Sequence, residues 1–361
     1  MSGLDDVVAA ETVLSDVDGE NGRLIIRGIA VEGLARHSSF EGAALLLFEG
    51  FFADLPDARA MSATLGRARA EAFARLACRL PVLSGLPPVE ALRAGLSLMP
   101  DGDDLATAFA LTAASAVLTA ATVRIERGAE PLAPDPERGH AADMLRMATG
   151  AEPTKAAERA LDAYLATVCE HGLNASTFAA RIAASTRAGL GSAVVAGLSA
   201  LKGPLHGGAP GPVLDMLAEI GEPARAVPWL EAALARGERL MGFGHRIYKV
   251  RDPRADALKA AVKALMKAGG AQSRLKLAEA VEKAALDLLH RAKPGRSLET
   301  NVEFYTAVLL DALGFPADSF TSVFASARVL GWIAHAREQE VSGRLIRPRS
   351  RYVGPEPRQA A

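Results

Sequence analysis

Three histidines lie in glycine-containing breaks of the chain. His171 is found in EHGLN, His206 in PLHGGA and His245 in GFGHR. Loops that are carried on a rigid scaffold often hold catalytic groups, and imidazole exchanges protons near neutral pH. These three positions are therefore candidates for a functional site. For the other histidines, which lie in helical or linker patterns, a surface or packed position is the better interpretation: His37, His140, His290 and His335.

Several arginines lie in short motifs that could bind an anion. Arg254 lies in DPR, Arg328 in SARVLG, and Arg347 with Arg349 in IRPRSRY. The guanidinium group offers a planar fork of donors that matches a carboxylate. Taken alone, each arginine could simply be surface charge. Arg328 argues against this, because it interrupts an apolar helix face, where a charge requires a partner such as an anionic substrate.

Three other kinds of site are weakly supported. A zinc site built from the three loop histidines lacks an HExxH motif or a His pair four residues apart. A serine hydrolase would require a GxSxG motif, and the sequence has none. Nucleotide binding through GxxxxGK[ST] or a strand-linked GxGxxG is likewise unsupported.

The bulk composition is that of an ordinary globular protein. The 361 residues are 50% hydrophobic and 23% charged, with a net charge of −1, so neither nucleic acid nor an anionic membrane is expected as a partner. The two cysteines, Cys78 and Cys169, exclude a disulfide framework or a Cys-rich zinc site. Residues 1–20 are acidic and lack a signal pattern, so we expect a cytoplasmic location.

Helical periodicity dominates the sequence. Residues 12–27 contain two β-prone runs around a DGENG turn, which predicts a small hairpin. Later segments carry apolar residues at helical spacing. These faces are Ala157, Leu161, Tyr164, Leu165 and Val168; Leu277, Val281, Ala284, Leu288 and Leu289; and Phe320, Val323, Phe324, Ala327 and Ala334. We predict a mainly α fold with minor β structure near the N-terminus.

Residues 105–123 test the possibility of a membrane span. They form 19 uncharged residues, close to spanning length, but eight are Ala and five are Ser or Thr. This composition is only weakly apolar, and small residues permit close helix packing. It therefore favours a buried helix, for example at a subunit interface.

The same motifs, read in order, resemble the citrate synthase family. GFGHRIYKVRDPR matches the family pattern G-F-G-H-x-I-x-x-x-x-D-P-R, and EHGLNASTFAARIAAST and LKGPLHGGAPGPVLDML resemble the segments of two further active-site histidines. LETNVEFYTAVLLDALGFP resembles the segment that carries the catalytic carboxylate. Together with the opening DGENGRLIIRG and the closing FASARVLGWIAHAREQ and LIRPRSRYVG, the similarity runs from about residue 8 to about 355.

The resemblance implies a two-domain helical fold and a tight homodimer. Residues 1–207 and 315–361 would form the large domain, and residues 208–314 the small one. The active site would lie in the cleft between the two domains.

The resemblance also implies catalytic roles. His206 would hold the thioester oxygen of an acyl-CoA, Glu303 would remove a proton from the adjacent carbon, and His245 would hydrogen-bond the oxaloacetate carbonyl and protonate the new alkoxide. Such proton removal requires a donor that stabilises the developing oxyanion.

Substrate-binding roles follow in the same way. His171, Arg254 and Arg328 would bind the oxaloacetate carboxylates, and Arg347 would be lent by the other subunit. The residues that would contact CoA are Gly242, Phe243, Gly244 and Lys249.

The implied activity is that of an acyltransferase that converts acyl to alkyl on transfer. Acetyl-CoA, oxaloacetate and water would give citrate and CoA with no tightly bound cofactor and no metal. A 2-methylcitrate synthase that uses propionyl-CoA remains an alternative, because one methylene separates the two substrates.

The sequence departs from the family pattern at three places. Glu303 stands where Asp is usual, Gly172 replaces a more usual acidic residue, and PPVEAL at 87–92 lacks the common His-Pro-Met. The first two motivate a second alternative, a catalytically weak paralogue that binds CoA or oxaloacetate. A purely structural helical protein would leave the loop histidines and arginines unexplained.

Overall fold

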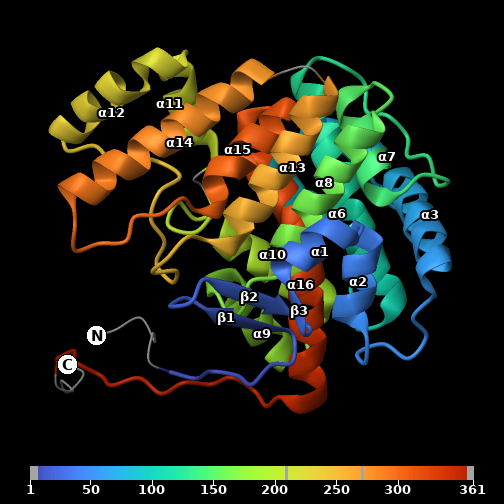
Figure 1. Cartoon of the computed structure of the whole chain (residues 1–361). Helices are drawn as coiled ribbons and strands as arrows, with labels where there is room; N and C mark the ends of the chain where they lie inside the picture. The colour runs from blue at the N-terminus through green and yellow to red at the C-terminus, as the bar shows by residue number, and fades with distance from the viewer. Residues whose placement is uncertain (1–6, 208–209, 270–271, 356–361) are drawn as a thin grey trace, which may run out of the picture.

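The computed structural model describes residues 7–207, 210–269 and 272–355. Helices make up most of this part of the chain, and three short strands form a single small sheet (Figure 1). The predicted mainly α class with minor β structure near the N-terminus is confirmed.

The sheet is an antiparallel meander near the N-terminus. Strands β1 (Ser15–Asp18), β2 (Arg23–Ile26) and β3 (Ile29–Ala30) pair in that order, with Ser15 opposite Ile26 and Asp18 opposite Arg23. The Asn21 amide donates to Asp18 Oδ1 at 3.0 Å and closes the turn. The predicted hairpin is therefore confirmed, and β3 extends it by one strand.

The helices follow in chain order. They are α1 (Val31–His37), α2 (Phe40–Phe48), α3 (Ala58–Leu76), α4 (Leu80–Leu83), α5 (Pro88–Leu96), α6 (Leu105–Glu126), α7 (His140–Thr149), α8 (Lys155–Val168), α9 (Ala175–Ser185), α10 (Leu190–Leu201), α11 (Pro210–Ile220), α12 (Ala226–Ala235), α13 (Pro253–Gly269), α14 (Gln272–Ala292), α15 (Val302–Ala312) and α16 (Phe320–Ser342), with short 3-10 turns at Ala77–Arg79, Pro223–Arg225 and Ala317–Ser319.

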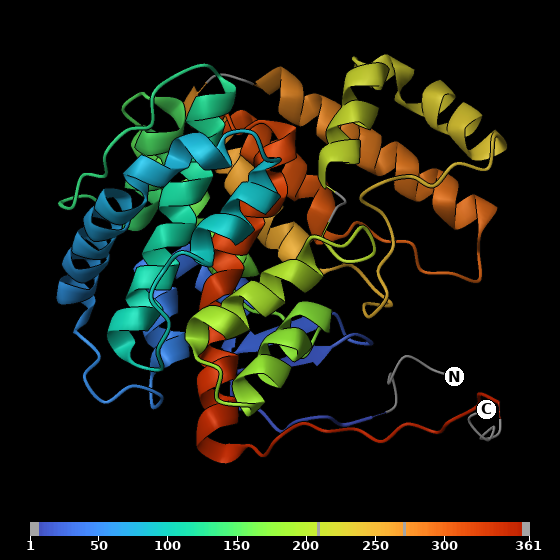
Figure 2. The same ribbon diagram turned by 180° about the vertical axis from the view of Figure 1, so that it is seen from behind.

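Helix α16 is the central element of the core. It runs through the middle of the bundle in both views (Figures 1 and 2) and packs against α6, α8, α9 and α10. Trp332 and Arg328 on this helix are buried. The apolar faces predicted for α8, α14 and α16 are mostly buried, as their spacing requires.

Helix α6 contains the uncharged segment 105–123. Among the described residues it is the one helix long and apolar enough to cross a membrane, and 83% of its most apolar window is buried inside the protein. It packs against α3, α5, α7 and α16. The segment is thus a buried helix, as predicted.

Helices α11, α12 and α14 lie together at one end of the molecule, away from the hairpin (Figures 1 and 2). Helix α12 packs on α14, and α11 packs on α15. The division into domains 1–207 with 315–361 and 208–314 stays a prediction, and its boundary at residue 208 lies outside the described residues.

Close packing of α10 on Trp332 predicts a stability effect. A Cβ at Gly197 would lie 2.8 Å from the buried indole ring, so we expect Gly197→Ala to lower the free energy of unfolding by about 1–3 kcal/mol. Gly33 in α1 is the matched control, because a Cβ there meets nothing closer than 3.7 Å. Gly33→Ala should raise that free energy by up to about 1 kcal/mol. Urea unfolding measures both, and equal stability of the two variants would refute this packing.

Candidate active site

The His245 loop is fastened to the start of α15. Gly242 and Gly244 have φ values of +86° and +83°, which favour glycine. The backbone amide of Asn301 donates to the Gly242 carbonyl at 3.0 Å, and the backbone amide of Gly244 donates to the Glu299 carbonyl at 2.7 Å. Because of these bonds, His245 is held beside the helix that carries Glu303.

The His245 ring is a neutral hydrogen-bond donor. Its Nδ1 accepts from the backbone amides of Ile247 and Tyr248 at 3.0 and 3.1 Å, which leaves the proton of the neutral ring on Nε2. Burial, with the positive charge of Arg254 as a further cause, lowers the pKa of His245 to about 4. At neutral pH the ring can therefore donate through Nε2 to an oxygen.

Arg254 is buried and held by one carboxylate. Its Nε and Nη2 donate to Asp252 Oδ1 and Oδ2 at 3.0 and 2.8 Å, and Nη2 lies 3.4 Å from His245 Nε2. Asp252 also accepts from the Val302 amide at 3.2 Å. Since the guanidinium and the His245 Nε2–H are both donors, a ligand oxygen could accept from both.

His171 adjoins His245 from the loop between α8 and α9. Their ring centroids are 5.9 Å apart, and His171 Nε2 lies 3.1 Å from the Tyr248 hydroxyl. Burial, aided by Arg254 and Arg328, holds the pKa of His171 well below its usual range. This second ring is therefore also neutral.

Arg328 presents an unsatisfied donor. Its Nε donates to the Val168 carbonyl at 2.8 Å, but its buried Nη2 has no hydrogen-bond partner among the described residues. Burial lowers the pKa of Arg328 to about 10, so the group remains charged at neutral pH. An unpaired buried N–H of this kind costs about 1–3 kcal/mol, which an anionic ligand would offset.

His206 is held against the start of α9. Its Nε2 lies 2.9 Å from Ser176 Oγ, and the Trp332 indole donates to the same oxygen at 3.2 Å. Asn174 caps this helix by accepting from the Ser176 and Thr177 amides. Burial, with Arg328 as the second cause, lowers the pKa of His206.

Glu303 is a partly buried carboxylate in the first turn of α15. No described residue donates a hydrogen bond to that carboxylate, although Asn301 caps the helix by accepting from the Glu303 amide at 3.0 Å. Burial raises the pKa of Glu303 to about 7, while Arg254 opposes the rise. A carboxylate with this pKa is matched to proton transfer near neutral pH.

The predicted catalytic and substrate-binding residues form one cluster, with the exception of Arg347. Arg254 acts electrostatically on His171, His245 and Glu303, and Arg328 acts on His171 and His206. Lys249 lies exposed on the His245 loop, and Phe243 is buried there.

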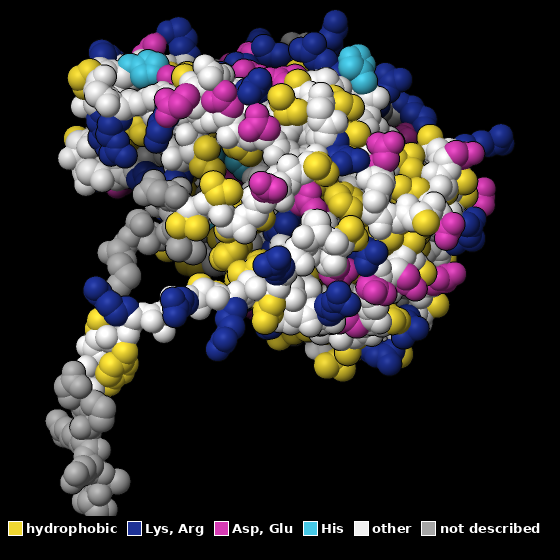
Figure 3. Space-filling view, turned by 90° about the horizontal axis from the view of Figure 1, so that it is seen from below, with side chains coloured by type: hydrophobic (Ala, Val, Ile, Leu, Met, Phe, Trp, Pro, Cys, Tyr) yellow, Lys and Arg dark blue, Asp and Glu magenta, His cyan; other side chains and the backbone are white. Residues whose placement is uncertain are grey.

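Arg347 is not brought to the cluster within one chain. It is exposed on the basic C-terminal segment, which extends away from the body of the molecule (Figure 3). A role for it in the site of another subunit remains a prediction.

Sequence reasoning missed three residues that position the cluster. Tyr248 contacts His171, Asp252 holds Arg254, and Ser176 contacts His206. Asp252 belongs to the matched DPR motif, and Tyr248 follows His245 by three residues, so their positions gave some signal. Among the described residues no group of three or more His, Cys, Asp or Glu could hold a metal ion, so the zinc alternative gains no support.

Comparison with known proteins agrees with this arrangement. The family model described as citrate synthase, C-terminal domain, matches residues 3–349. The chain belongs to the citrate synthase family. It is 37% identical to a citrate synthase of Haloferax volcanii, over 98% of this chain and 95% of that protein. It is also 36% identical to a 2-methylcitrate synthase of Mycobacterium tuberculosis, over 99% of this chain and 91% of that protein.

A solved citrate synthase has the same fold. The enzyme of Thermoplasma acidophilum, in a ternary complex with carboxymethyl coenzyme A and oxaloacetate, superposes with a TM-score of 0.86 and 29% identity. The match covers 99% of this chain and 97% of that one. The citrate synthase relationship therefore extends over the whole length of both folds.

The raised pKa of Glu303 predicts a pH-dependent stability. Because the folded-state pKa of about 7 exceeds the ordinary 4.5, burying the charge costs stability increasingly as the pH rises from about 4.5 to about 7. Glu303→Gln should therefore raise the free energy of unfolding by up to about 3 kcal/mol at pH 8, and by less than about 1 kcal/mol at pH 5.

Chemical denaturation at the two pH values measures this difference. The matched control is Glu231→Gln, because Glu231 is exposed on α12; it should change little at either pH. A Glu303→Gln effect that is the same at pH 5 and pH 8 would contradict the proposed environment of the carboxylate.

Proposed function

We propose that this chain condenses acetyl-CoA with oxaloacetate and water to give citrate and CoA. The observation that carries the proposal is the gathering of Glu303, whose pKa lies near neutrality, with neutral histidines and two buried arginines. The related citrate synthase of Thermoplasma acidophilum, whose structure is a ternary complex with carboxymethyl coenzyme A and oxaloacetate, supports the same pair of substrates.

Oxaloacetate binds to the buried positive charges. It is a dianion, and Arg254 and Arg328 each present guanidinium donors. The Nη2 of Arg328, which has no partner among the described residues, can donate to a carboxylate oxygen. His171 completes the carboxylate site. His245 Nε2–H then donates to the ketone oxygen and polarises the carbon that will be attacked.

Glu303 and His206 form the nucleophile. Glu303 removes a proton from the methyl carbon of acetyl-CoA while His206 donates a hydrogen bond to the thioester oxygen, where negative charge develops. Neither step works alone, because the carbon acid is far weaker than the carboxyl group. Each positioned acid or base contributes about 10²- to 10⁴-fold in rate.

Carbon–carbon bond formation then uses His245 as the acid. The enolate carbon attacks the polarised ketone, and the new alkoxide takes the Nε2 proton of His245. The proton that Glu303 has taken balances the one that His245 gives up, and exchange through water returns both groups to their starting states. Water hydrolyses the resulting thioester, which releases citrate and free CoA. The reaction is an acyl transfer in which the acyl group becomes an alkyl group, and it needs no tightly bound cofactor.

The remaining assignments complete the proposal. The residues proposed to contact CoA are Gly242, Phe243, Gly244 and Lys249. Arg347 enters the site of the second subunit of a homodimer, for which its exposed position on the extended C-terminal segment is suited. The enzyme works in the cytoplasm. Its active site lies between a large and a small domain, which close over both ligands.

Glu303 decides between an active enzyme and a weak paralogue. We expect CoA thiol release from acetyl-CoA that depends strictly on oxaloacetate, with kcat/KM rising with pH through an apparent pKa near 7 as the base becomes ionised. Glu303→Gln should reduce the rate at least about 100-fold, whereas Glu231→Gln should leave it unchanged.

A thiol assay over pH 5–9 tests this expectation. Absence of CoA release by the wild-type protein would support the paralogue, and full turnover by Glu303→Gln would place the base elsewhere.

The second candidate function, 2-methylcitrate synthase, is favoured by the 36% identity to such an enzyme. The two substrates differ by one methylene, which a pocket distinguishes by about 1–3 kcal/mol. We expect acetyl-CoA to have the higher kcat/KM by about 10- to 200-fold when both acyl-CoAs compete. Product analysis by mass spectrometry measures the ratio, and an excess of methylcitrate would reverse the assignment.

A further inference from the structure

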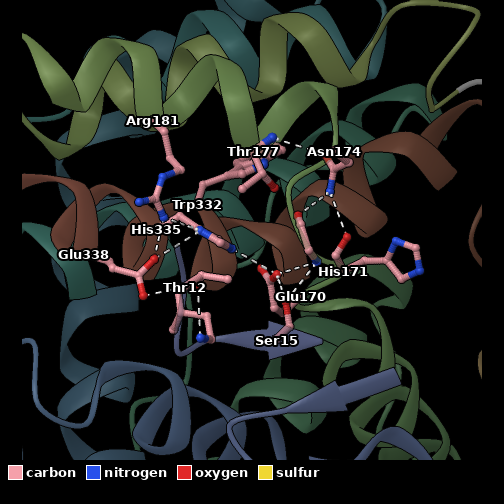
Figure 4. A network of polar contacts seen from close by, with 12 residues as sticks. Thr12, Ser15, Glu170, His171, Asn174, Thr177, Arg181, Trp332, His335 and Glu338 are labelled. Carbon is pink, nitrogen blue, oxygen red and sulfur yellow. Dashed lines mark hydrogen bonds and ion pairs between the residues drawn. The ribbon is translucent and has the colours of Figure 1, made fainter. Parts of the chain in front are cut away.

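The strand β1 lies directly on the His171 loop (Figure 4). Ser15 Oγ donates to Glu170 Oε1 at 2.8 Å, and the Gly172 amide lies 3.1 Å from the same Ser15 oxygen. The Gly172 amide also donates to Glu170 Oε1 at 2.6 Å. The residues on both sides of His171 are therefore fixed against this strand.

Gly172 allows the strand to lie so close. It has a φ of +63°, and a Cβ there would lie 2.8 Å from Val17 Cγ2. A larger residue would be strained by its backbone and would collide with the strand. The close contact between β1 and the backbone at Gly172 thus gives a physical reason for glycine at a position where an acidic residue is more usual in the family.

The turn of the hairpin lies on the other active-site loop. The Lys249 amide donates to the Gly19 carbonyl at 2.8 Å. A Cβ at Gly19 would lie 2.4 Å from the Ile247 carbonyl oxygen, so backbone meets backbone here. Ile247 is one of the two residues whose amides hold His245 Nδ1.

The base of the hairpin is anchored to α16 by buried polar groups (Figure 4). Glu338 Oε1 accepts from the Val13 amide at 2.8 Å and from the Thr12 hydroxyl at 3.1 Å. On the same helix, His335 lies 3.0 Å from Glu170 and 2.9 Å from Arg181. One end of the hairpin is therefore fixed to the core, while its strand and turn reach the two loops.

We propose that the N-terminal hairpin, residues 15–26, is a positioning element that sets His171 and His245 relative to each other. The proposal rests on the proposed function, because it assigns these histidines to oxaloacetate. Strand β1 supports the ring that binds the carboxylate, and the turn supports the ring that protonates the alkoxide. Both rings touch Tyr248, and their centroids lie 5.9 Å apart, so a shift of either loop alters this spacing.

Two substitutions separate the two supports. Gly172→Ala pushes on Val17 and displaces the His171 loop, so we expect the KM for oxaloacetate to rise about tenfold, with a smaller change in kcat. Gly19→Ala pushes on the Ile247 backbone and displaces His245, so we expect kcat to fall about 10- to 100-fold, with a smaller change in KM.

Gly28 provides a control for backbone strain. It lies between β2 and β3 with a φ of +82°, and a Cβ there would meet nothing within 4 Å. Gly28→Ala therefore imposes strain like that at Gly172 without touching either loop, and it should leave kcat and KM unchanged even if the melting temperature falls. Val17→Ala, combined with Gly172→Ala, removes the colliding methyl group and should restore most of the KM.

Steady-state kinetics and calorimetric titration with oxaloacetate test the proposal. The proposal is established if Gly172→Ala changes mainly KM, Gly19→Ala changes mainly kcat, and Val17→Ala restores the KM of Gly172→Ala. Kinetics of Gly172→Ala and Gly19→Ala that equal those of Gly28→Ala would overturn it. If the wild-type protein releases no CoA, titration still decides: oxaloacetate binding that is weaker in Gly172→Ala than in Gly28→Ala supports the positioning role although the reaction is wrong. Equal binding in both overturns it.

Discussion

The Asp252–Arg254 ion pair is the interaction on which the candidate site depends. Both groups are almost completely buried, with 1% and 3% of their surface exposed, and the paired geometry is bidentate. Separating two such charges would leave each unpaired at low dielectric, which is strongly destabilising. Because Asp252 also accepts from the Val302 amide, the pair ties the His245 loop to the helix of Glu303. The proposed base, Glu303, and the proposed acid, His245, thus share one support.

The arginines, the histidines and Glu303 of the candidate site differ in their charge states at neutral pH. The buried arginines supply fixed positive charge, and that charge, together with burial, keeps the histidines near them neutral. Neutral imidazoles can donate hydrogen bonds without repelling the arginines beside them. The same burial weakens the ionised form of Glu303 and makes its carboxylate a stronger base. One low-dielectric environment therefore lowers the pKa values of the histidines and raises that of Glu303, which are the directions that the proposed reaction requires.

Much of the fold and of the candidate site could be predicted from the sequence, but the residues that hold the site in place could not. Helical periodicity identified the buried faces of α8, α14 and α16, and the DGENG turn identified the hairpin. The motifs pointed to His171, His206, His245 and Glu303, which the fold gathers. The third strand, β3, was missed because its two residues are too few to show the alternation of apolar and polar side chains that marks a strand. Tyr248 and Ser176 were missed because their partners lie 77 and 30 residues away, and only tertiary packing creates such contacts.

The indole of Trp332 gives the interior of this protein an optical reporter. It is fully buried, and it shares the Ser176 oxygen with His206. The other tryptophan, Trp229, lies on α12, which Figure 1 shows at one end of the molecule, away from α16. Because indole emission responds to hydrogen bonding and local polarity, a displacement of His206 from the shared Ser176 oxygen should change the emission of Trp332. Binding of a ligand beside His206 should therefore change the intrinsic fluorescence of the chain, so that binding can be followed with no added label.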